Sequence, residues 1–443
     1  MPSNPHIIII GGGASGIILV RQLLHFHPSA HISIVEKKNP WGAGVAYNTP
    51  YDFHVLNVRA ANMSAFPGKP DDFVNWLKEK KLPYSGAGFV PRKIYGDYLC
   101  ELAELPAGKK EQVRFIRDEA LRVEKRLVHL ASGETLRGDF IVIAAGNFLP
   151  TKPAAVRDEI AQDKNYHPDP WNYTDLENIG PAEDVLIIGS GLTMTDVALF
   201  LHHRGHTGEI TSLSIHGFAP EVHGTHISPN ETFRDEMRAC ETLSGYLRTW
   251  KKYAASGIGA ESLAASIRPF VQELWLKISI PERRQFIEHL RHFWGTARHR
   301  VPEQCFSVLE KMQPGQLRFI GGRIKVIGKS AGRFEIFYVP RSYATTTSVK
   351  AHHIINCTGP SLHYEKDAPV FLRTMLEEGL VCRDPLRLGL DADSTGQLIN
   401  PKGGLHADLF AMGSLLRGTL WEITSVPDIR VQAEKLAKLL LGL

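Results

Sequence analysis

The chain has 443 residues, of which 43% are hydrophobic and 22% are charged, and its formal net charge is +4 at pH 7. This composition is typical of a globular protein of two or three domains, and so small a net charge gives no reason to expect a nucleic acid or a membrane as partner. No apolar run approaches the roughly 20 residues that cross a bilayer, and the N-terminal MPSNPH lacks the basic region of a signal peptide. Five scattered cysteines without a C-x-x-C motif argue against a redox disulfide or a zinc site, so we expect a cytoplasmic protein with reduced thiols and no metal.

The first strand is expected at Ile7–Ile10, because an unbroken run of β-branched residues is typical of a parallel strand that is buried on both faces. A G-x-G-x-x-G turn follows at Gly11, Gly13 and Gly16, and Ile17–Leu24 is expected to be a helix. Such glycines permit a tight turn, the close approach of a pyrophosphate, and close packing of helix and strand. The N-terminus of the helix would then bind the anion, so the turn predicts a dinucleotide site.

The next predicted strand, His31–Val35, ends in Glu36, where a dinucleotide-binding unit usually holds a ribose hydroxyl. Two glycines beside aromatic residues follow in the stretch that begins at Trp41, which is consistent with backbone close to a flat ligand or with a plain turn. The further elements expected in this unit are helices at Phe73–Lys80 and after Phe89, strands of a meander in Val113–Leu130, and a buried strand at Phe140–Ala144 that ends in Ala145-Gly146-Asn147.

A polar, proline-rich crossover at Thr151–Asn178 is expected to lead into a second nucleotide-binding unit. There the predicted strand Val185–Ile188 is followed by Gly189 and Gly191 and then by a helix. Met194 replaces the third glycine of the motif, so helix and strand must pack differently from those of the first unit.

The strand expected next, Ile210–Ile215, ends at His216. No acid stands there to bind a ribose 2′-hydroxyl, and no arginine to bind a 2′-phosphate. The sequence therefore does not distinguish NADH from NADPH. His216 would bind a phosphate only in its protonated form, which its usual pKa of about 6.5 makes marginal.

Residues 229–313 have apolar residues at helical spacing and are predicted to form a helical insertion. The insertion carries many cations, among them His289 and His292. Because no acidic or cysteine ligands are grouped with these histidines, we interpret them as part of a solvated basic face rather than as a metal site. Its densest cation cluster, Arg298-His299-Arg300, could bind a phosphate or a substrate carboxylate.

The chain then repeats itself. Gln316–Ile320 resembles Gln112–Ile116, and Ile354–Gly359 resembles Ile141–Gly146. Two similar nucleotide-binding units, the second interrupted by the insertion, explain these echoes. The tail is expected to add a strand at Leu409–Met412 and a final core-packing helix that runs to the C-terminus.

Together these motifs resemble the two-dinucleotide-binding-domain flavoproteins, and most closely the bacterial FAD/NAD(P)-binding proteins. The resemblance implies an α/β fold with two Rossmann-like dinucleotide-binding domains, one for FAD and one for NAD(P), and a helical insertion. It implies a first part of the FAD-binding domain at 1–150, an NAD(P)-binding domain at 151–362 that contains the insertion at about 229–313, and the C-terminal part of the FAD-binding domain at 363–443. The stretches that carry it are IIIIGGGASG, WGAGVAY, HVLNVRAANMSAFP, FVPRKIYGDYL, FIVIAAGN, VLIIGSGLTMTD, INCTGP and LFAMGSLLRGTLWEITSVPDIRVQAEKLA.

The resemblance also implies which residues bind the cofactors. FAD is expected on the first glycine turn, NAD(P)H on the second, and the flavin ring beside the stretch that begins at Gly413. Related flavoproteins often carry Asp after this glycine, where this chain has Ser414. The predicted cofactor-binding residues are Gly11, Gly13, Ala14, Ser15, Gly16, Glu36, Lys37, Trp41, Asn57, Ser64, Gly146, Gly189, Gly191, Gly413, Trp421 and Glu422. The residues predicted to contact the substrate or NAD(P) are His167, Trp171, His216, Arg298 and Arg300.

Class B flavin monooxygenases share this plan, and their Baeyer–Villiger members carry F-x-G-x-x-x-H-x-x-x-W between the two domains. His167 and Trp171 supply the second half of that motif, but Ala161 and Asp163 stand at its phenylalanine and glycine positions. Ketone oxygenation is therefore not supported, and the pair is equally consistent with a structural clasp in the linker. N-hydroxylating relatives keep amine oxygenation open.

The leading hypothesis is an FAD-dependent oxidoreductase that is reduced by NAD(P)H and uses dioxygen to oxygenate a small molecule such as an amine or an amino acid. Two alternatives stay open: an NAD(P)H-dependent reductase or dehydrogenase without oxygenation, and a non-catalytic flavin-binding scaffold or sensor. The sequence identifies neither the substrate nor the catalytic residues, and it leaves open whether copies of the chain form a homo-oligomer.

Overall fold

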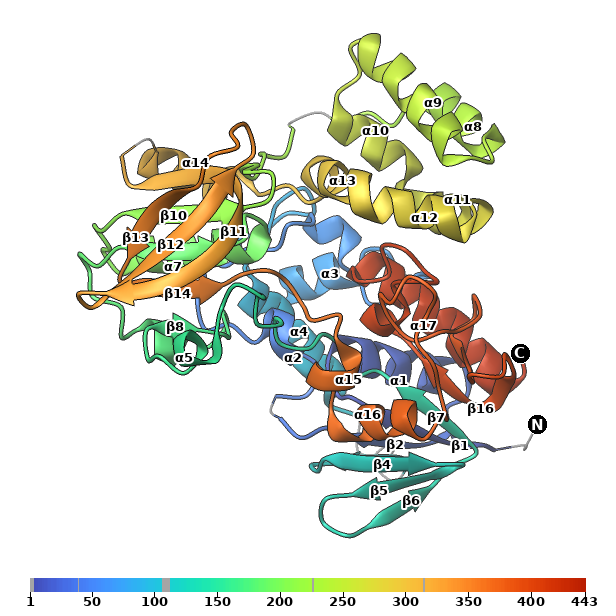
Figure 1. Ribbon diagram of the computed structural model, residues 1–443. Coiled ribbons are helices and arrows are strands. Elements are labelled where there is room, and N and C mark those ends of the chain that lie inside the picture. Colours follow the sequence, from blue (N-terminus) through green and yellow to red (C-terminus); the bar gives the residue numbers. More distant parts are fainter. Residues whose placement is uncertain (1–3, 39, 106–111, 225–226, 314) are drawn as a thin grey trace.

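The computed structural model describes residues 4–38, 40–105, 112–224, 227–313 and 315–443. Figure 1 shows three lobes, of which two are built around β-sheets and one is helical. The mixed α/β architecture expected from the sequence is thus confirmed.

The first sheet has six strands in the order β15-β16-β7-β1-β2-β3. All neighbours are parallel except β15, which pairs antiparallel with β16 at one edge. The isoleucine run of β1 is at most 4% exposed, because other elements cover both faces of the sheet. The strands are β1 (His6–Ile10), β2 (His31–Val35), β3 (Val113–Ile116), β7 (Phe140–Ile143), β15 (Gln397–Ile399) and β16 (Leu405–Ala411).

Helices from both ends of the chain cover one face of this sheet. α1 packs against α4 and α17, and their apolar side chains share a core with those of the sheet. α16 and a small three-stranded sheet enclose a second core on the opposite face. The C-terminal part of the chain therefore returns to the first unit. The helices are α1 (Ala14–Phe26), α2 (Gly44–Tyr47), α3 (Asp72–Glu79), α4 (Arg92–Ala103), α15 (Tyr364–Asp367), α16 (Val370–Glu377) and α17 (Val426–Leu441).

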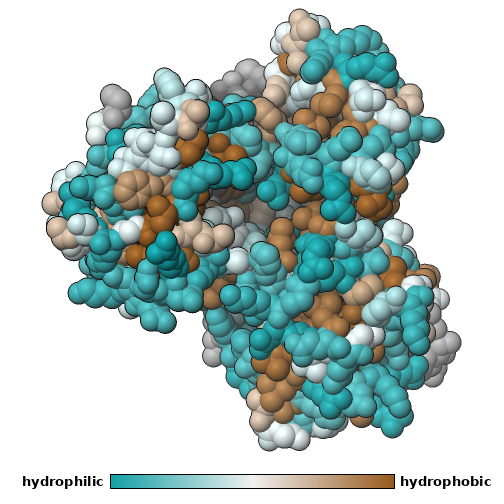
Figure 2. All heavy atoms as spheres, viewed as in Figure 1, coloured by the Kyte–Doolittle hydropathy of each residue, from teal (hydrophilic) through white to brown (hydrophobic). Residues whose placement is uncertain are grey.

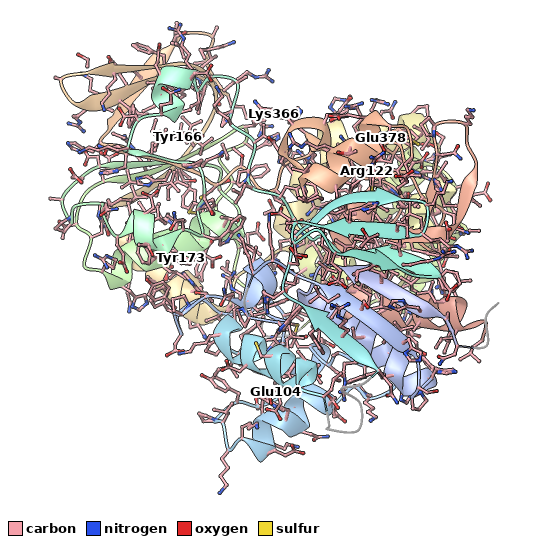
Figure 3. All side chains as sticks on the ribbon, turned by 90° about the horizontal axis from the view of Figure 1, so that it is seen from below. Glu104, Arg122, Tyr166, Tyr173, Lys366 and Glu378 are labelled. Carbon is pink, nitrogen blue, oxygen red and sulfur yellow. The ribbon has the colours of Figure 1, made fainter. Side chains whose placement is uncertain are left out.

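The meander expected over Val113–Leu130 is wrong for its first strand. β3 is an edge strand of the large sheet, parallel to β2, because its buried residues complete the large sheet's core. The next three strands form the small antiparallel sheet, which packs against α16. In Figure 3 Arg122 of this sheet lies near Glu378 at the end of α16, and Arg122 Nη2 is 3.0 Å from Glu378 Oε1. The small sheet contains β4 (Ala120–Glu124), β5 (Leu127–Leu130) and β6 (Thr135–Arg137).

The second sheet repeats the central strand order of the first. Its seven strands run β13-β12-β11-β10-β9-β14-β8, in which β14-β9-β10-β11 corresponds to β7-β1-β2-β3. Both sets are parallel throughout, so the echoes in the sequence mark equivalent strands. Its elements are α5 (Asp158–Ala161), β8 (Tyr166–His167), α6 (Tyr173–Leu176), β9 (Val185–Ile188), α7 (Leu192–His203), β10 (Ile210–Ser214), β11 (Leu317–Ser330), β12 (Arg333–Pro340), β13 (Thr347–Ala351) and β14 (His353–Asn356).

The helical insertion leaves the second unit after β10 and returns before β11. Its helices α8 to α13 enclose an aromatic and aliphatic core, against which Leu386 and Trp421 of the C-terminal part also pack. α14 packs instead on α7, and its Leu309 and Met312 belong to the core of the second unit. The helices are α8 (Glu231–Ala239), α9 (Leu243–Ala255), α10 (Ala260–Ile267), α11 (Val271–Lys277), α12 (Ile280–Gln285), α13 (Arg291–Arg298) and α14 (Glu303–Met312), with a π-helical turn at Phe286–Leu290.

Candidate functional site

Two glycines of the first turn are required by the fold itself. Gly11 has a φ of +117°, and a Cβ at this position would lie 2.3 Å from the carbonyl oxygen of Ala144. A Cβ on Gly16 would lie 2.0 Å from the carbonyl oxygen of Gly11. Any larger residue would therefore distort the turn or push α1 away from β1.

Gly13, between them, is not required by the fold. Its φ of −75° is ordinary, and a Cβ would meet nothing closer than the Cα of Gly44, at 3.6 Å. No side chain caps α1, and Ala14 and Ser15 at its start are partly exposed. The glycine thus leaves space in front of N–H groups that have no partner within the helix, which is the arrangement that a phosphate group needs.

The second turn reproduces this geometry. Gly189 has a φ of +119°, and its Cβ would lie 2.3 Å from the carbonyl oxygen of Cys357, which follows β14 as Ala144 follows β7. Gly191 has an ordinary φ of −89°, its Cβ would have no neighbour within 4 Å, and no side chain caps α7. Met194 is fully buried in the core of the second unit, so the close approach that Gly16 permits is absent here.

Glu36 lies at the first turn. Its Oε2 accepts a hydrogen bond from the N–H of Gly12 at 2.9 Å, and its Oε1 accepts one from the N–H of Lys38 at 2.9 Å. A carboxylate has about four acceptor positions, so capacity remains for a ribose hydroxyl. Lys37 points elsewhere, because its Nζ lies 2.7 Å from Glu119 Oε1 in a surface ion pair.

Trp41 covers the same turn. A Cβ on Gly12 would lie 2.5 Å from the Trp41 ring, and the N–H of Gly42 donates to the carbonyl oxygen of Gly12 at 2.8 Å. The guanidinium of Arg117 lies over the ring, 4.0 Å from its centroid. The loop after β2 is therefore packed onto the glycine turn rather than forming a plain exposed turn.

The C-terminal stretch meets the first turn at Gly413. This residue has a φ of +68°, its Cβ would lie 3.1 Å from Ser15 Oγ, and its N–H donates to Gln432 Oε1 at 2.9 Å. Ser414 Oγ is buried and has no hydrogen-bond partner among the described residues. Gly146, at the end of the neighbouring strand, also has a left-handed φ and open space beside it. A buried hydroxyl that lacks a partner among the described residues is consistent with a contact to a polar ligand atom.

Two other predicted cofactor residues make internal contacts instead. Trp421 stacks on Trp275 of the insertion, with ring centroids 5.1 Å apart. Ser64 is fully buried, and its hydroxyl donates to the carbonyl oxygen of Lys69 at 2.6 Å and accepts from the N–H of Phe66 at 3.0 Å.

Glu422 joins the C-terminal stretch to the insertion. Its Oε1 accepts a hydrogen bond from Trp294 Nε1 at 2.8 Å and lies 3.7 Å from His299 Nε2, and its Oε2 lies 3.6 Å from Arg298 Nε. Burial alone would raise the pKa of Glu422. Three neighbours have the opposite and larger effect: His299 through its hydrogen bond and charge, Arg298 through its charge, and Trp294 through its N–H. Together they lower the pKa of Glu422 to about 2. The residue is therefore a carboxylate at neutral pH, held with a φ of +67°.

A cleft of about 240 Å³ lies between the two sheet-containing units. In the space-filling view the three lobes surround a hollow (Figure 2). Of the predicted residues, Asn57 and Arg298 line the cleft. Arg92 of α4 and Asp196 of α7 also line it and form an ion pair between the units, with side chains 18% and 9% exposed.

His54 is fully buried beside this ion pair. Its Nε2 lies 3.1 Å from the carbonyl oxygen of Asp196, which can only accept, and its Nδ1 lies 2.7 Å from the Thr49 hydroxyl. Burial lowers the pKa of His54 to about 4, so the ring is neutral at pH 7. The residues predicted from the sequence do not include His54, Arg92 or Asp196. Arg92 stands in a stretch that carries the family resemblance, but its partner is 104 residues away.

The basic cluster at the end of the insertion is divided by the structure. Arg298 lines the cleft, whereas Arg300 does not. Arg300 Nη2 lies 2.5 Å from Glu221 Oε2, and its Nη1 donates to the carbonyl oxygen of Val222 at 2.9 Å. Of the two arginines, the geometry leaves only Arg298 in a position to contact a ligand in the cleft.

His216, at the end of β10, lies in an aromatic cluster. It stacks on Phe218 with centroids 5.2 Å apart, and its ring centroid is 4.5 Å from that of His292 in the insertion. Burial, and then the charge of Arg341, lowers the pKa of His216. The neutral form is therefore favoured, which weakens the case for a phosphate contact through this side chain.

His167 and Trp171 do not line the cleft. His167 is 1% exposed and belongs to a chain of hydrogen bonds. Its Nδ1 lies 2.7 Å from Asp175 Oδ2, and its Nε2 lies 3.0 Å from His353 Nδ1. The other ring nitrogen of His353, Nε2, lies 2.9 Å from Glu183 Oε2. Trp171 donates its backbone N–H within a turn. These contacts favour the structural clasp over a ligand contact.

Across the described ranges, no group of three or more His, Cys, Asp or Glu side chains is placed to hold a metal ion. Within the same ranges, no helix combines the length and the apolar character needed to traverse a bilayer.

Comparison with known proteins gives the same fold. Residues 8–148 match the family model described as FAD-NAD(P)-binding. No curated protein matches the chain. Solved structures match it over nearly its whole length.

Three of these structures are of enzymes that are named for an amine or an amino acid. The ornithine N-hydroxylase from Kutzneria sp. 744, with reduced FAD, NADP⁺ and L-ornithine, has 12% sequence identity and a TM-score of 0.67, and the match covers 98% of each chain. The FAD-bound cadaverine monooxygenase from Erwinia amylovora has 14% identity and a TM-score of 0.67, and the match covers 99% of this chain and 94% of that one. The L-lysine 6-monooxygenase from Pseudomonas syringae has 15% identity and a TM-score of 0.65, and the match covers 98% of each chain. The first unit therefore matches the FAD-NAD(P)-binding family, and the chain as a whole has the fold of the two-dinucleotide-binding-domain flavoproteins.

Proposed function

We propose that this protein is an FAD-dependent oxidoreductase that takes reducing equivalents from NAD(P)H and oxygenates a small molecule. One observation carries the proposal: two glycine turns of the same geometry, each with space in front of a helix N-terminus, belong to units that meet at one cleft. A protein that bound a single dinucleotide would need only one such turn.

The first unit fits FAD. Gly13 and the start of α1 would hold the pyrophosphate, Glu36 the ribose, and Ser414 a polar atom of the flavin tail. Gly191 and the start of α7 would hold the pyrophosphate of NAD(P)H. The chemistry supplied by the bound cofactors is hydride transfer and dioxygen activation.

The chain's own residues would orient the cofactors and keep water out of the cleft. Arg92 and Asp196 fix the two units relative to each other, and Glu422 with Trp294 fixes the insertion onto the C-terminal stretch. The cleft is lined by the two units, the insertion and the C-terminal stretch. Such a site is suited to oxygenation, because keeping bulk water out prevents side reactions of reactive species with water.

We further propose the domain division 1–150, 151–362 and 363–443, because the first and third segments share one sheet. The substrate is proposed to be a small molecule, without a nucleic-acid or membrane partner. A cytoplasmic location is supported by five unpaired cysteines, since thiols stay reduced there.

The test follows the flavin spectrum of the purified protein. We expect bound FAD, rapid loss of its visible absorbance when NADPH or NADH is added without oxygen, and a product heavier by one oxygen atom when air and an oxidisable substrate are supplied. L-Ornithine, L-lysine and cadaverine are the first compounds to try, because enzymes of the same fold are named for acting on them. Reduction with no oxygenated product from any compound class would favour the reductase, and no reduction by either nucleotide would favour the scaffold.

A further inference from the structure

The helical insertion forms most of the wall of a partly open cavity of about 450 Å³. Sites for small molecules usually measure about 300 to 1,000 Å³, and an apolar protein cavity of about 150 Å³ already binds benzene. Apolar side chains, in brown, are visible on this lobe in Figure 2. The aromatic residues that the insertion contributes to the walls are Tyr246, Trp250, Trp275, Phe286, Phe293 and Trp294.

Most polar atoms in these walls already have partners within the protein. Tyr246 donates to the carbonyl oxygen of Leu274 at 3.1 Å, and Thr296 donates to that of His292 at 3.1 Å. Trp275 Nε1 donates to the carbonyl oxygen of Gly418 at 2.8 Å, and Trp294 Nε1 to Glu422 at 2.8 Å. Glu221, the charged wall residue, pairs with Arg300. Of these groups only Glu221, whose side chain is 50% exposed, keeps acceptor positions beyond its ion pair.

Trp421 differs from the other wall residues. Its ring is held between Trp275 and Phe286, with centroid distances of 5.1 and 5.5 Å. Its Nε1 is buried and lacks a hydrogen-bond partner among the described residues. An unpartnered buried N–H costs free energy unless another molecule satisfies it. The unpartnered N–H of Trp421 therefore belongs to a wall residue of a largely apolar cavity.

The cavity and the cleft between the units share a wall. At the end of α13, Ala297 lines the cavity and the next residue, Arg298, lines the cleft. In the C-terminal stretch, Trp421 lines the cavity and Thr424 lines the cleft. This stretch begins at Gly413, beside Ser15 of the first glycine turn. A molecule in the cavity would thus lie across one wall from the cleft between the two units.

We propose that this cavity binds the body of the substrate, and that the substrate is a neutral, largely apolar molecule with an aromatic or branched hydrocarbon group and one hydrogen-bond acceptor directed at Trp421. The assignment rests on the proposed function, because it names the substrate class for that oxygenation. It departs from ornithine, lysine and cadaverine, which are linear and charged at neutral pH.

Desolvation is the physical reason for this choice. Moving an isolated charge from water into an apolar cavity is strongly unfavourable unless an opposite charge meets it. The carboxylate of Glu221 is already paired with Arg300, and Glu422 is held by Trp294, Arg298 and His299. A neutral ligand avoids that cost and gains free energy from every apolar surface that it buries.

Binding is tested by titration calorimetry on the full-length protein with its bound flavin and without NAD(P)H, so that no turnover occurs. Acetophenone has a ring and one acceptor, ethylbenzene has the ring alone, and L-ornithine and cadaverine are the charged probes. We expect saturable binding of acetophenone with a negative heat-capacity change. Loss of one neutral hydrogen bond should make ethylbenzene about 2- to 13-fold weaker, and the charged probes should bind weakest.

Three variants locate the site. Ala260 is exposed at the cavity wall, so Ala260→Trp should obstruct the cavity without disturbing the core and weaken acetophenone at least tenfold. Ala255→Trp, at an exposed helix end that does not line the cavity, is the matched control and should bind normally. Trp421→Phe keeps an aromatic ring but removes the N–H, so acetophenone should fall to the affinity of ethylbenzene while ethylbenzene is unchanged.

The proposal is overturned if acetophenone does not bind, if Ala260→Trp binds it as the control does, or if cadaverine or L-ornithine binds more tightly than acetophenone. Failure of the oxygenase assignment would look different. In that case acetophenone and Ala260→Trp would behave as expected, but no apolar compound would yield an oxygenated product with NAD(P)H and air.

Discussion

Arg92 and Asp196 form an ion pair that crosses from the first unit to the second. Arg92 stands at the start of α4, beside the first sheet, and Asp196 lies in α7, which follows the second glycine turn. Both side chains are largely removed from solvent, and His54 donates to the backbone carbonyl of Asp196 at the same place. The relative position of the two nucleotide sites therefore depends on a charge pair that water barely screens.

The first prediction concerns this pair. Arg92→Met leaves the carboxylate of Asp196 buried without a partner, which should lower the free energy of unfolding by about 3 to 5 kcal/mol. The double variant Arg92→Met/Asp196→Leu removes both charges and should recover most of that loss. Scanning calorimetry at saturating FAD measures both variants. A double variant as unstable as the single one would show that packing, and not the charge, is responsible.

The second prediction concerns the first glycine turn. Gly13→Val places a branched side chain where the protein itself leaves space, so the fold should persist while bound FAD is lost. Gly68→Val is the matched control, because Gly68 is exposed and a Cβ there has no neighbour within 4 Å. Flavin content is read from the visible spectrum of each purified variant. Stoichiometric FAD in Gly13→Val would remove the first unit from the proposed site.

Both glycine turns could be predicted because their information is local. A strand, a turn and a helix follow each other within a few residues, and the positive φ values of Gly11 and Gly189 are dictated by that geometry. The internal repeat was equally visible, since β3 and β11 occupy equivalent places beside β2 and β10. Strands of four residues do not reveal their partners, however, which is why β3 was assigned to the meander.

The side chains whose contacts could not be predicted from the sequence depend on distant segments of the chain. Glu422 and Trp421 stand in a stretch expected beside the flavin, but the insertion lies between residues 229 and 313 and supplies their partners. His167 completes half of a known motif, yet its ring is held by Asp175 and His353. Only the tertiary structure shows which of two roles such a residue has.

The third prediction concerns the second turn. Gly191→Val should leave FAD bound but slow its reduction by NAD(P)H at least tenfold, which corresponds to about 1.4 kcal/mol of transition-state stabilisation. Gly328→Val in β11 is a suitable control, because a Cβ there has no neighbour within 4 Å and valine is favoured in strands. Stopped-flow absorbance measures the reduction rate. An unchanged rate in Gly191→Val would mean that hydride enters by another route.

The fourth prediction concerns pH. The pKa of Glu422 lies near 2 in the folded chain and near its usual value of about 4.5 in the unfolded chain. This depressed pKa contributes roughly 3 kcal/mol to the free energy of unfolding. The contribution is fully present above pH about 4.5. It is lost as the pH falls toward 2, because the carboxylate is protonated at a higher pH in the unfolded chain than in the folded chain. Urea unfolding of the wild type and of Glu422→Gln at several pH values tests this. Their difference in stability should shrink as the pH is lowered, and a constant difference would refute the low pKa.

The last prediction separates the two arginines of the basic cluster. Arg298 lines the cleft, and its Nε lies 3.6 Å from Glu422 Oε2 without a hydrogen-bond partner among the described residues, so its other N–H groups are the ones that can bind a phosphate there. Charge-assisted hydrogen bonds contribute about 1.5 to 3 kcal/mol, so Arg298→Ala should raise the KM for NAD(P)H roughly 10- to 150-fold. Arg300→Ala is the internal control for the NAD(P)H site, because Arg300 pairs with Glu221 and does not line the cleft, so its loss should leave the KM for NAD(P)H unchanged. Steady-state kinetics at two salt concentrations, with flavin content checked in each variant, distinguishes the two. A KM for NAD(P)H that equals the wild-type value in both variants would show that the cluster only anchors the insertion.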